Sequence, residues 1–240
     1  MNRTIDLNCD LGEGLGNEQD LMPLLSSCNI ACGGHAGSVD TMDEAIALAV
    51  EQGVRIGAHP SFPDRANFGR VVMDMEPIEI QRSVERQLGL FRERAARQRA
   101  PVHHVKAHGA LYNLAAADEP VARAVVRAMR SVQDGVRLYA PFASVIERVA
   151  RDAGVEVVHE AFADRTYHAD GNLAPRSHPR ALITDPDEVV AHVERMVSRS
   201  VVRSVQGSET PIQAQTFCVH GDNPRALDLL NRLRRAFTVA

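Results

Sequence analysis

Short apolar runs alternate with longer segments of helical periodicity along the whole chain. The apolar runs predict strands at 5–8, 29–31, 55–58, 102–107, 137–140, 156–159 and 215–220. Segments with apolar residues three or four positions apart predict helices at 20–26, 40–52, 77–98, 120–131, 144–153, 185–199 and 223–237. The polar stretch 198–210 is expected to be a loop. Because strands and helices alternate, the sheet should be parallel.

Two α/β architectures suit this alternation: a closed (β/α) barrel with about seven strands and a doubly wound sheet. The glycines Gly12, Gly14 and Gly16 are spaced G-x-G-x-G and lie among acidic residues, which disfavours a dinucleotide site. The chain contains no evident linker or repeat. We therefore expect a single domain over 1–240.

The amino-acid composition limits the classes of partner that the chain is expected to bind. The net charge of −4 and the aromatic content of 4% disfavour nucleic acid and anionic membranes. No apolar run approaches the length of about 18 residues that a membrane helix needs. The start of the chain lacks the apolar core of a signal peptide, and four cysteines are too few for a disulfide scaffold. These features predict a cytoplasmic protein with reduced thiols.

Polar residues gather where the first predicted strand ends. Asp6, Asn8 and Asp10 alternate, so a strand would point all three to one face, and Glu13 follows closely. Buried polar groups need partners. Two interpretations remain open: a hydrogen-bonded plug inside the barrel, or part of a functional site. Cys9 should point the other way, into the packing layer behind the wall.

Four histidines stand at the ends of different predicted strands with glycines nearby: His35, His59, His108 and His220. The carboxyl ends of barrel strands carry the active site in this fold. Lys106 is the single lysine among 27 basic residues and lies in the same region. The other histidines lack this context and are expected to be structural or on the surface: His103, His104, His159, His168, His178 and His192.

Two chemistries suit these residues. Imidazoles and carboxylates that converge can hold a divalent metal that activates water. They can also act without metal as general bases, beside an ammonium that stabilises an oxyanion. A serine nucleophile is disfavoured because no G-x-S-x-G elbow is present. A thiol–imidazole pair of Cys32 and His35 is a minor alternative.

The same segments resemble the LamB/YcsF family. The resemblance runs in order from residue 5 to about 235. It rests on 6–14 (DLNCDLGEG), 29–33 (NIACG) with 35–37 (HAG), 57–60 (GAHP), 68–70 (FGR), 105–106 (VK) with 108–113 (HGALYN), 160–165 (EAFADR), 170–171 (DG) with 175–176 (PR), and 220–222 (HGD). Gly34 and Ala107 depart from the usual pattern, where we expect Phe and Pro.

The resemblance implies a fold, an activity and partners. It implies an irregular TIM-like barrel related to glycoside hydrolase and deacetylase barrels. It also implies the A subunit of a bacterial ATP-dependent 5-oxoprolinase, which hydrolyses 5-oxo-L-proline to L-glutamate together with subunits B and C. Because the chain has no G-x-x-x-x-G-K-[ST] motif, the partner subunits are expected to use the ATP.

Roles for individual residues follow as hypotheses. The expected catalytic residues are Asp10, Glu13, Asp64, Lys106 and His108. The expected substrate-binding residues are Asn8, Arg70, Tyr112, Arg176 and His220. Related barrels bind one metal with an Asp and two His, a set that Asp10, His35 and His59 would imitate. Replacing Lys106 with Met is expected to abolish turnover and leave the fold intact.

Two other functions remain open. The chain could be a self-sufficient metal-dependent amidohydrolase or deacetylase that acts on a lactam or amide. It could also be a non-catalytic component that binds 5-oxoproline or stabilises its partners, and a homo-oligomer is compatible with any of these. The enzyme hypotheses predict that changes at Asp10 and His108 abolish activity, whereas the binding hypothesis predicts that they are tolerated.

Overall fold

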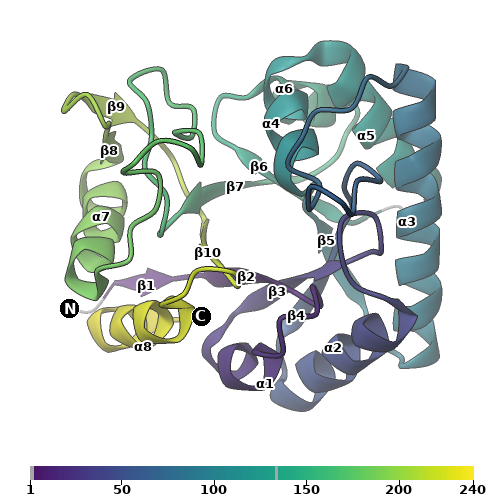
Figure 1. Ribbon diagram of the computed structural model, residues 1–240, viewed down its shortest axis with the longest axis horizontal. Helices are drawn as coiled ribbons and strands as arrows, with labels where there is room; N and C mark the ends of the chain where they lie inside the picture. The colour runs from purple at the N-terminus through teal and green to yellow at the C-terminus, as the bar shows by residue number, and fades with distance from the viewer. Residues whose placement is uncertain (1–2, 133–134) are drawn as a thin grey trace.

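The computed structural model describes residues 3–132 and 135–240, and a closed barrel of parallel strands lies at its centre (Figure 1). The strands follow the order β10-β2-β3-β4-β5-β6-β7. Their bounds are β2 Leu7–Leu11, β3 Ser27–Ala31, β4 Arg55–His59, β5 Val102–Val105, β6 Arg137–Pro141, β7 Val157–Phe162 and β10 Thr216–His220. The seven-stranded barrel predicted from the sequence is confirmed, and the doubly wound alternative is wrong, because β10 pairs with both β7 and β2.

Helices surround the barrel on the outside (Figure 1). They are α2 Val39–Gln52, α3 Pro77–Arg97, α5 Glu119–Val132, α6 Val145–Asp152, α7 Pro186–Arg199 and α8 Ala226–Ala236. The first predicted helix is a single turn, α1 Glu18–Leu21, followed by a 3₁₀ turn, η1 Met22–Leu24. The helix positions expected from periodicity are otherwise confirmed to within a few residues.

Some elements were not predicted. Helix α4 (Gly109–Ala117) begins just after the β5 region and is apolar on nearly all sides, so it has no amphipathic period. The expected loop 198–210 contains β8 (Val201–Arg203) and the start of β9 (Glu209–Pro211), which pair antiparallel. Strands β1 (Thr4–Ile5) and β11 (Thr238–Val239) form a small parallel sheet. Strands of two or three residues are too short to show a period.

Local signals position the loop that carries His35. Ser38 caps α2, its hydroxyl accepting a hydrogen bond from the Thr41 amide at 3.2 Å, and the Thr41 hydroxyl accepts one from the Ser38 amide at 2.8 Å. Helix α2 ends at Gly53, whose φ of 69° suits a glycine. The capping box fixes where α2 begins, and it therefore fixes the short loop between β3 and α2.

The barrel wall separates a polar interior from an apolar layer under the helices. In β2, Leu7, Cys9 and Leu11 are buried in the apolar core, while Asn8 and Asp10 are buried polar residues. This alternation confirms the packing role expected for Cys9. Within the described ranges, no helix combines the length and apolar character needed to cross a membrane.

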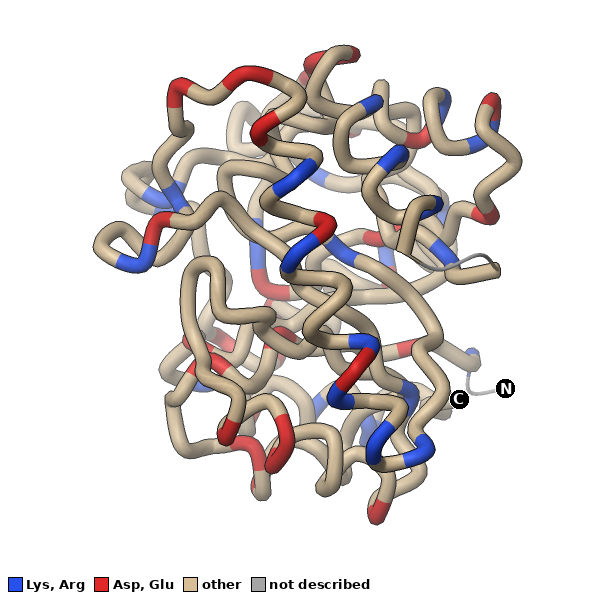
Figure 2. The backbone as a smooth tube through the Cα atoms, turned by 90° about the vertical axis from the view of Figure 1, so that its right-hand side faces the viewer, with Lys and Arg blue, Asp and Glu red and all other residues tan. Residues whose placement is uncertain are grey.

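Helix α3 is amphipathic. Its residues Ile80, Val84, Leu88 and Phe91 are buried in the apolar core. Figure 2 looks onto this side of the molecule and shows acidic and basic residues spread along the helix. Charges of both signs on one face are typical of a helix side that lies in solvent.

Candidate active site

A cavity of about 260 Å³ opens at the carboxyl ends of the barrel strands. Asp10 lines it from β2, His59 from the end of β4, and His220 from the end of β10. Lys106, which directly follows β5, lines it as well. Because all barrel strands run in parallel, residues distant in sequence meet at one end of the barrel.

Lys106 is at the centre of the charged groups. Its Nζ lies 2.9 Å from Asp10 Oδ1 and 2.8 Å from Glu160 Oε1, and the side chain is 2% exposed. The Glu160 contact is an ion pair whose angles do not meet hydrogen-bond geometry. Nζ also approaches Cys218 Sγ at 3.1 Å. Burial by itself would lower the pKa of Lys106, but Asp10, Cys218 and Glu160 outweigh it and raise the pKa well above its usual value.

Below Lys106 the interior is filled with hydrogen-bonded polar side chains. Asn29 Nδ2 donates to Asn8 Oδ1 and to Asp10 Oδ1, both at 2.8 Å. Asn8 Nδ2 donates to Thr216 Oγ1 at 2.8 Å, and His104 Nε2 lies 2.6 Å from Asn29 Oδ1. Asn8 is therefore part of a polar plug, whereas Asp10 lines the cavity. Asn8 therefore fits the interpretation as a hydrogen-bonded plug, and Asp10, nearer the strand ends, fits the interpretation as part of a functional site.

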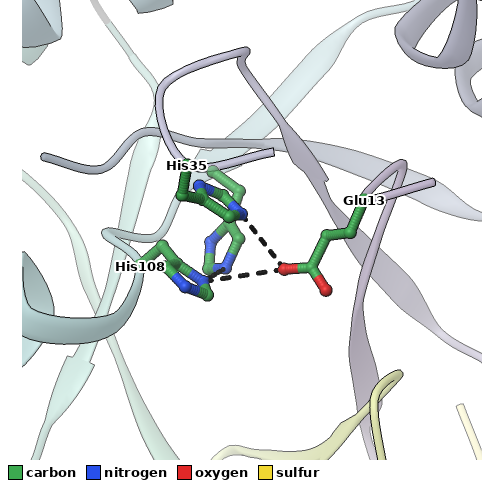
Figure 3. A group of neighbouring side chains, drawn as sticks. Glu13, His35 and His108 are labelled. Carbon is green, nitrogen blue, oxygen red and sulfur yellow. Dashed lines mark hydrogen bonds and ion pairs between the residues drawn. The ribbon is translucent and has the colours of Figure 1, made fainter. Parts of the chain in front are cut away.

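Three histidines and one carboxylate form a second cluster, which we call the histidine cluster: Glu13, His35, His59 and His108. His35 Nε2 is 3.1 Å from Glu13 Oε1, and His108 Nδ1 is 3.7 Å from the same oxygen (Figure 3). His108 Nδ1 is also 2.9 Å from His59 Nε2. One potential ligand atom of each residue lies within 4.8 Å of all the others.

The loop after β4 holds the histidine rings in place. The His35 and His108 rings stack with centroids 3.7 Å apart, and the Phe68 ring meets both edge-on. Gly69 has a φ of +63°, and a Cβ there would lie 2.8 Å from His35 Cβ. Only a glycine lets this loop approach so closely.

Backbone carbonyls determine which ring nitrogens carry hydrogen. The Lys106 carbonyl accepts from His59 Nδ1 at 2.8 Å, and the Phe68 carbonyl accepts from His108 Nε2 at 3.0 Å. In the neutral rings, His59 Nε2 and His108 Nδ1 therefore both present lone pairs, 2.9 Å apart. Two facing lone pairs repel each other unless a proton or a metal cation lies between them.

Burial favours the neutral forms of His35 and His108. It lowers the pKa of His35 to about 3, with His59 as the next contributor. It also lowers the pKa of His108 well below its usual value, again helped by His59 and by His35. Burial raises the pKa of Glu13, and the charges of Asp10 and Asp222 raise it further. Neutral imidazoles are donors that Zn²⁺ and similar divalent metals take, and Glu13 can join them once it loses its proton to the metal. The residues present are therefore suited to a metal.

The cluster only partly matches the metal-binding set expected from the sequence. His35 and His59 belong to it, but Glu13 and His108 complete it in place of Asp10. Asp10 Oδ2 is 3.4 Å from His59 Nε2, while its Oδ1 contacts Lys106. Burial would raise the pKa of Asp10, but His59 and Lys106 hold it well below the usual range. Asp10 thus stays ionised beside the cluster.

Arginines line another part of the cavity. Arg70 and Arg176 both pair with the Asp222 carboxylate, and Arg176 Nη1 lies 3.2 Å from Asp222 Oδ2. Burial would raise the pKa of Asp222, but Arg176, His220 and Arg70 lower it below its ordinary value. Two guanidiniums on one carboxylate leave N–H groups for another anion.

Asp164 orients His220. Its Oδ1 lies 2.8 Å from His220 Nδ1, and its Oδ2 accepts from the His220 amide at 3.1 Å and from Asn223 Nδ2 at 3.0 Å. A carboxylate on Nδ1 keeps the hydrogen there, so the neutral ring has Nε2 as an acceptor. The His220 ring stacks on Phe162, which also lines the cavity.

The remaining predicted residues lie at different distances from the cavity. Tyr112 lines it, and its buried hydroxyl has no hydrogen-bond partner within the described part of the chain. Asn8 Oδ1 is 3.5 Å from Lys106 Nζ. Asp64 does not line the cavity, and its Oδ1 accepts from the Asn67 amide at 3.2 Å in the loop after β4. A catalytic role for Asp64 stays a prediction without a contact in its support.

Sequence reasoning assigned no role to four residues that the structure brings to the cavity or to its charged groups: Glu160, Arg165, Cys218 and Asp222. Glu160 was overlooked because the predicted strand stops at residue 159, whereas β7 continues to Phe162. Extending the alternation by three residues would have pointed Glu160 inward. Cys218 carried no signal, since its importance depends on Lys106 reaching it across the barrel.

Comparison with known proteins identifies relatives that match nearly the whole chain. The LamB/YcsF family profile matches residues 5–240. A Bordetella pertussis protein named as the A subunit of 5-oxoprolinase is 46% identical over 241 aligned residues, which cover 98% of this chain and 96% of the relative. The solved structure of the lactam utilization protein from Thermus thermophilus has a TM-score of 0.90 and 41% identity, covering 97% of this chain and 95% of that one. A GH113 β-1,4-mannanase, at 12% identity and a TM-score of 0.51 over 98% of this chain and 99% of the other, is similar in fold alone. The chain belongs to the LamB/YcsF family.

Proposed function

We propose that this chain is the A subunit of an ATP-dependent 5-oxoprolinase, which hydrolyses 5-oxo-L-proline to L-glutamate together with subunits B and C. The relatives of that name and the lactam utilization protein support the proposal by their identity over nearly the whole chain. The observation that carries it is the buried Lys106, held between Asp10 and Glu160 in a cavity. A fixed ammonium beside a carboxylate suits the opening of a lactam, which needs a base and an oxyanion partner.

Two carboxylates with opposite pKa shifts provide an acid and a base. Asp10 keeps a low pKa, so it is ionised near neutral pH and is placed to take up a proton as the attacking water adds. Glu13 has a raised pKa, so without a metal it holds a proton and can serve as the acid for the ring nitrogen. Water adds to the carbonyl carbon, and the C–N bond breaks as the nitrogen takes up the proton. Lys106 donates to the oxygen that becomes negative.

The substrate carboxylate has partners in the same cavity. Arg70 and Arg176 would bind it beside Asp222. His220 and Tyr112 line the same cavity and would contact the ring. ATP is assigned to the partner subunits, because this chain lacks a P-loop. In this scheme the partners phosphorylate the amide oxygen, and water adds to the activated carbon in this chain. C–N cleavage then leaves an acyl phosphate, which a second water hydrolyses to glutamate and inorganic phosphate.

A divalent metal is proposed for the histidine cluster, held by Glu13, His35, His59 and His108. Bound there, it would supply Lewis-acid polarisation of the lactam carbonyl. The protein purified with and without a chelator, followed by elemental analysis and thermal unfolding, tests this. We expect about one metal per chain and a Tm that falls on chelation, with both effects lost in His59→Gln. A metal-free protein whose Tm does not respond to added Zn²⁺ or Mn²⁺ would remove the metal.

The function is tested by glutamate release from 5-oxoproline with this chain, subunits B and C, and ATP. We expect release only when all components are present. Asp10→Asn should lower the rate by about a hundredfold or more, since it removes the base. Asp20→Asn changes an exposed carboxylate on α1 and serves as the matched control, with a rate within about twofold of the wild type. No release in any combination would refute the proposal.

The second candidate is a self-sufficient metal-dependent amidohydrolase. The facing lone pairs of His59 and His108 favour it, because they suit a metal that could activate water without ATP. Glutamate release by this chain alone, inhibited by a chelator and indifferent to ATP, would support this candidate over the first.

A further inference from the structure

A groove with a volume of about 550 Å³ lies outside the candidate active site and shares no lining residue with it. Its walls come from the segment that follows β7, from helix α7, and from strand β8 with the turn after it. Figure 1 shows these elements together on one side of the barrel. Pockets for small molecules have volumes of about 300–1,000 Å³, so this groove is large enough to hold a ligand.

Three arginines line the groove, one from each of its walls. They are Arg180 in the segment after β7, Arg195 on α7 and Arg203 on β8. Arg180 Nη2 donates to the Val205 carbonyl at 2.6 Å. In residues 3–132 and 135–240, none of the three forms an ion pair, and the side chains of Arg195 and Arg203 form no hydrogen bond. Most of their N–H groups are therefore free to bind a ligand.

The lining of the groove carries more positive than negative charge. Among the described residues, Glu188 is its one acidic member, and it lies seven positions before Arg195 on the same side of α7. His192 also lines the groove, and burial together with Arg195 lowers the pKa of its imidazole to about 4, so the ring is neutral near pH 7. Three arginines and one glutamate leave an excess of two positive charges.

The acidic residues next to the groove in sequence have other partners. Those partners are His220 and Asn223 for Asp164, Asn172 for Asp170, backbone amides of α7 for Asp185, Arg232 for Asp187, Arg3 for Glu194 and Arg199 for Glu209. None of these carboxylates lines the groove. The excess positive charge is therefore not balanced within the part of the chain that the structure describes, and a bound anion would lower its electrostatic cost.

We propose that this groove binds a small polyanion, a molecule with two or more phosphate or carboxylate groups, at a site separate from the candidate active site. An excess of two positive charges suits a ligand with at least two negative charges. Each guanidinium presents planar N–H donors that match the paired oxygens of a phosphate or carboxylate group. Arginines on three separate walls can contact more than one such group. The site adds a ligand to the proposed function and does not depend on it.

Isothermal titration calorimetry of the full chain tests the site with pyrophosphate and with citrate. The protein is first treated with a chelator and dialysed, so that no metal in the histidine cluster binds the probes. We expect a Kd below about 1 mM for at least one probe, and the Kd should rise as NaCl screens the charges. Acetate, with a single carboxylate, should bind at least about a hundredfold more weakly. Tighter binding of pyrophosphate assigns the site to phosphate groups, and tighter binding of citrate assigns it to carboxylate groups.

Variants at the groove locate the bound anion. Arg195→Met and Arg203→Met should each weaken binding by about tenfold. Because neither side chain forms a hydrogen bond or an ion pair within the described ranges, both variants should fold, which circular dichroism checks. Glu188→Gln should strengthen binding by about two- to fivefold, because it removes the negative charge of the lining.

Arg199→Met is the matched control for the loss of one positive charge. It changes the same helix, but Arg199 pairs with Glu209 at 2.7 Å and lies outside the groove. It should change the Kd by less than about twofold. Arg176→Met, in the candidate active site, should also leave the Kd within about twofold of the wild type, because the two sites are separate.

Several results would overturn the proposal. A Kd above about 1 mM for both probes removes the site. Equal weakening by Arg195→Met and Arg199→Met indicates a general effect of charge, and equal weakening by Arg195→Met and Arg176→Met places the anion in the candidate active site. A glutamate-rich peptide that binds when neither probe does would make the groove a surface for an acidic protein segment instead. The proposed function is tested separately, because this calorimetry needs neither subunits B and C nor glutamate release.

Discussion

Replacing Lys106 with Met removes one buried charge and leaves two others unbalanced. The ammonium lies 2.9 Å from Asp10 Oδ1 and 2.8 Å from Glu160 Oε1. With an effective dielectric constant of about 20, each contact is worth about 6 kcal/mol of attraction. Most of this is offset by the cost of removing the charges from water. Loss of one partner from a buried ion pair destabilises proteins by about 3–5 kcal/mol, which is the effect we expect on the free energy of unfolding.

The sequence alone led to the expectation that Lys106→Met would leave the fold intact. The expected loss in the free energy of unfolding replaces that expectation with a destabilised variant. The double variant Lys106→Met with Glu160→Gln removes a second charge and should recover about 1–3 kcal/mol of the loss, because the two residues are coupled. Neither variant should release glutamate. The double variant thus separates the role of Lys106 in chemistry from its role in stability.

Urea unfolding followed by circular dichroism measures both free energies, and glutamate release measures activity. Arg86→Met, at an exposed cation on α3, is the control and should stay within about 0.5 kcal/mol of the wild type. A Lys106→Met protein as stable as that control would refute the reasoning about the buried ion pairs. A Lys106→Met protein with near-normal turnover would remove Lys106 from the mechanism.

Other expected outcomes concern packing and pH. Gly57→Ala should cost about 1–3 kcal/mol in unfolding free energy, because its Cβ would lie 2.1 Å from His104 Nε2; a variant as stable as the wild type in urea would contradict this. Gly69→Ala should push His35 away and abolish metal uptake in elemental analysis, whereas Gly14→Ala, also at a positive φ but with no atom near its Cβ, should retain it. The neutral His35, with a folded pKa of about 3, should cause stability to fall as the pH drops below the unfolded value of about 6.5, by at most about 1.4 kcal/mol per pH unit. Urea unfolding at pH 7.5 and 5.0 should show a shallower loss in His35→Gln, and an equal slope in both proteins would contradict the reasoning.

The strands, the parallel barrel and the position of the site at the strand ends could be predicted from the sequence. Buried parallel strands leave short apolar runs, and a barrel places its polar residues where those runs end. Helix α4 escaped prediction because apolar residues lie on nearly all of its sides, which erases the amphipathic period. β8 and β9 escaped because three residues are too few to show alternation.

The partners of each side chain were decided only by the tertiary structure. Asp10 and Lys106 are 96 positions apart, and their contact depends on how β2 to β5 pair, including the register shift between Ile56 and Gly57. The sequence determined which residues stand at the strand ends, because local periodicity sets which way a side chain points. It did not determine that Glu13 and His108 would join His35 and His59. Those contacts depend on barrel closure and loop packing. Both bring together segments that are far apart in the sequence, and no local pattern indicates which segments will meet.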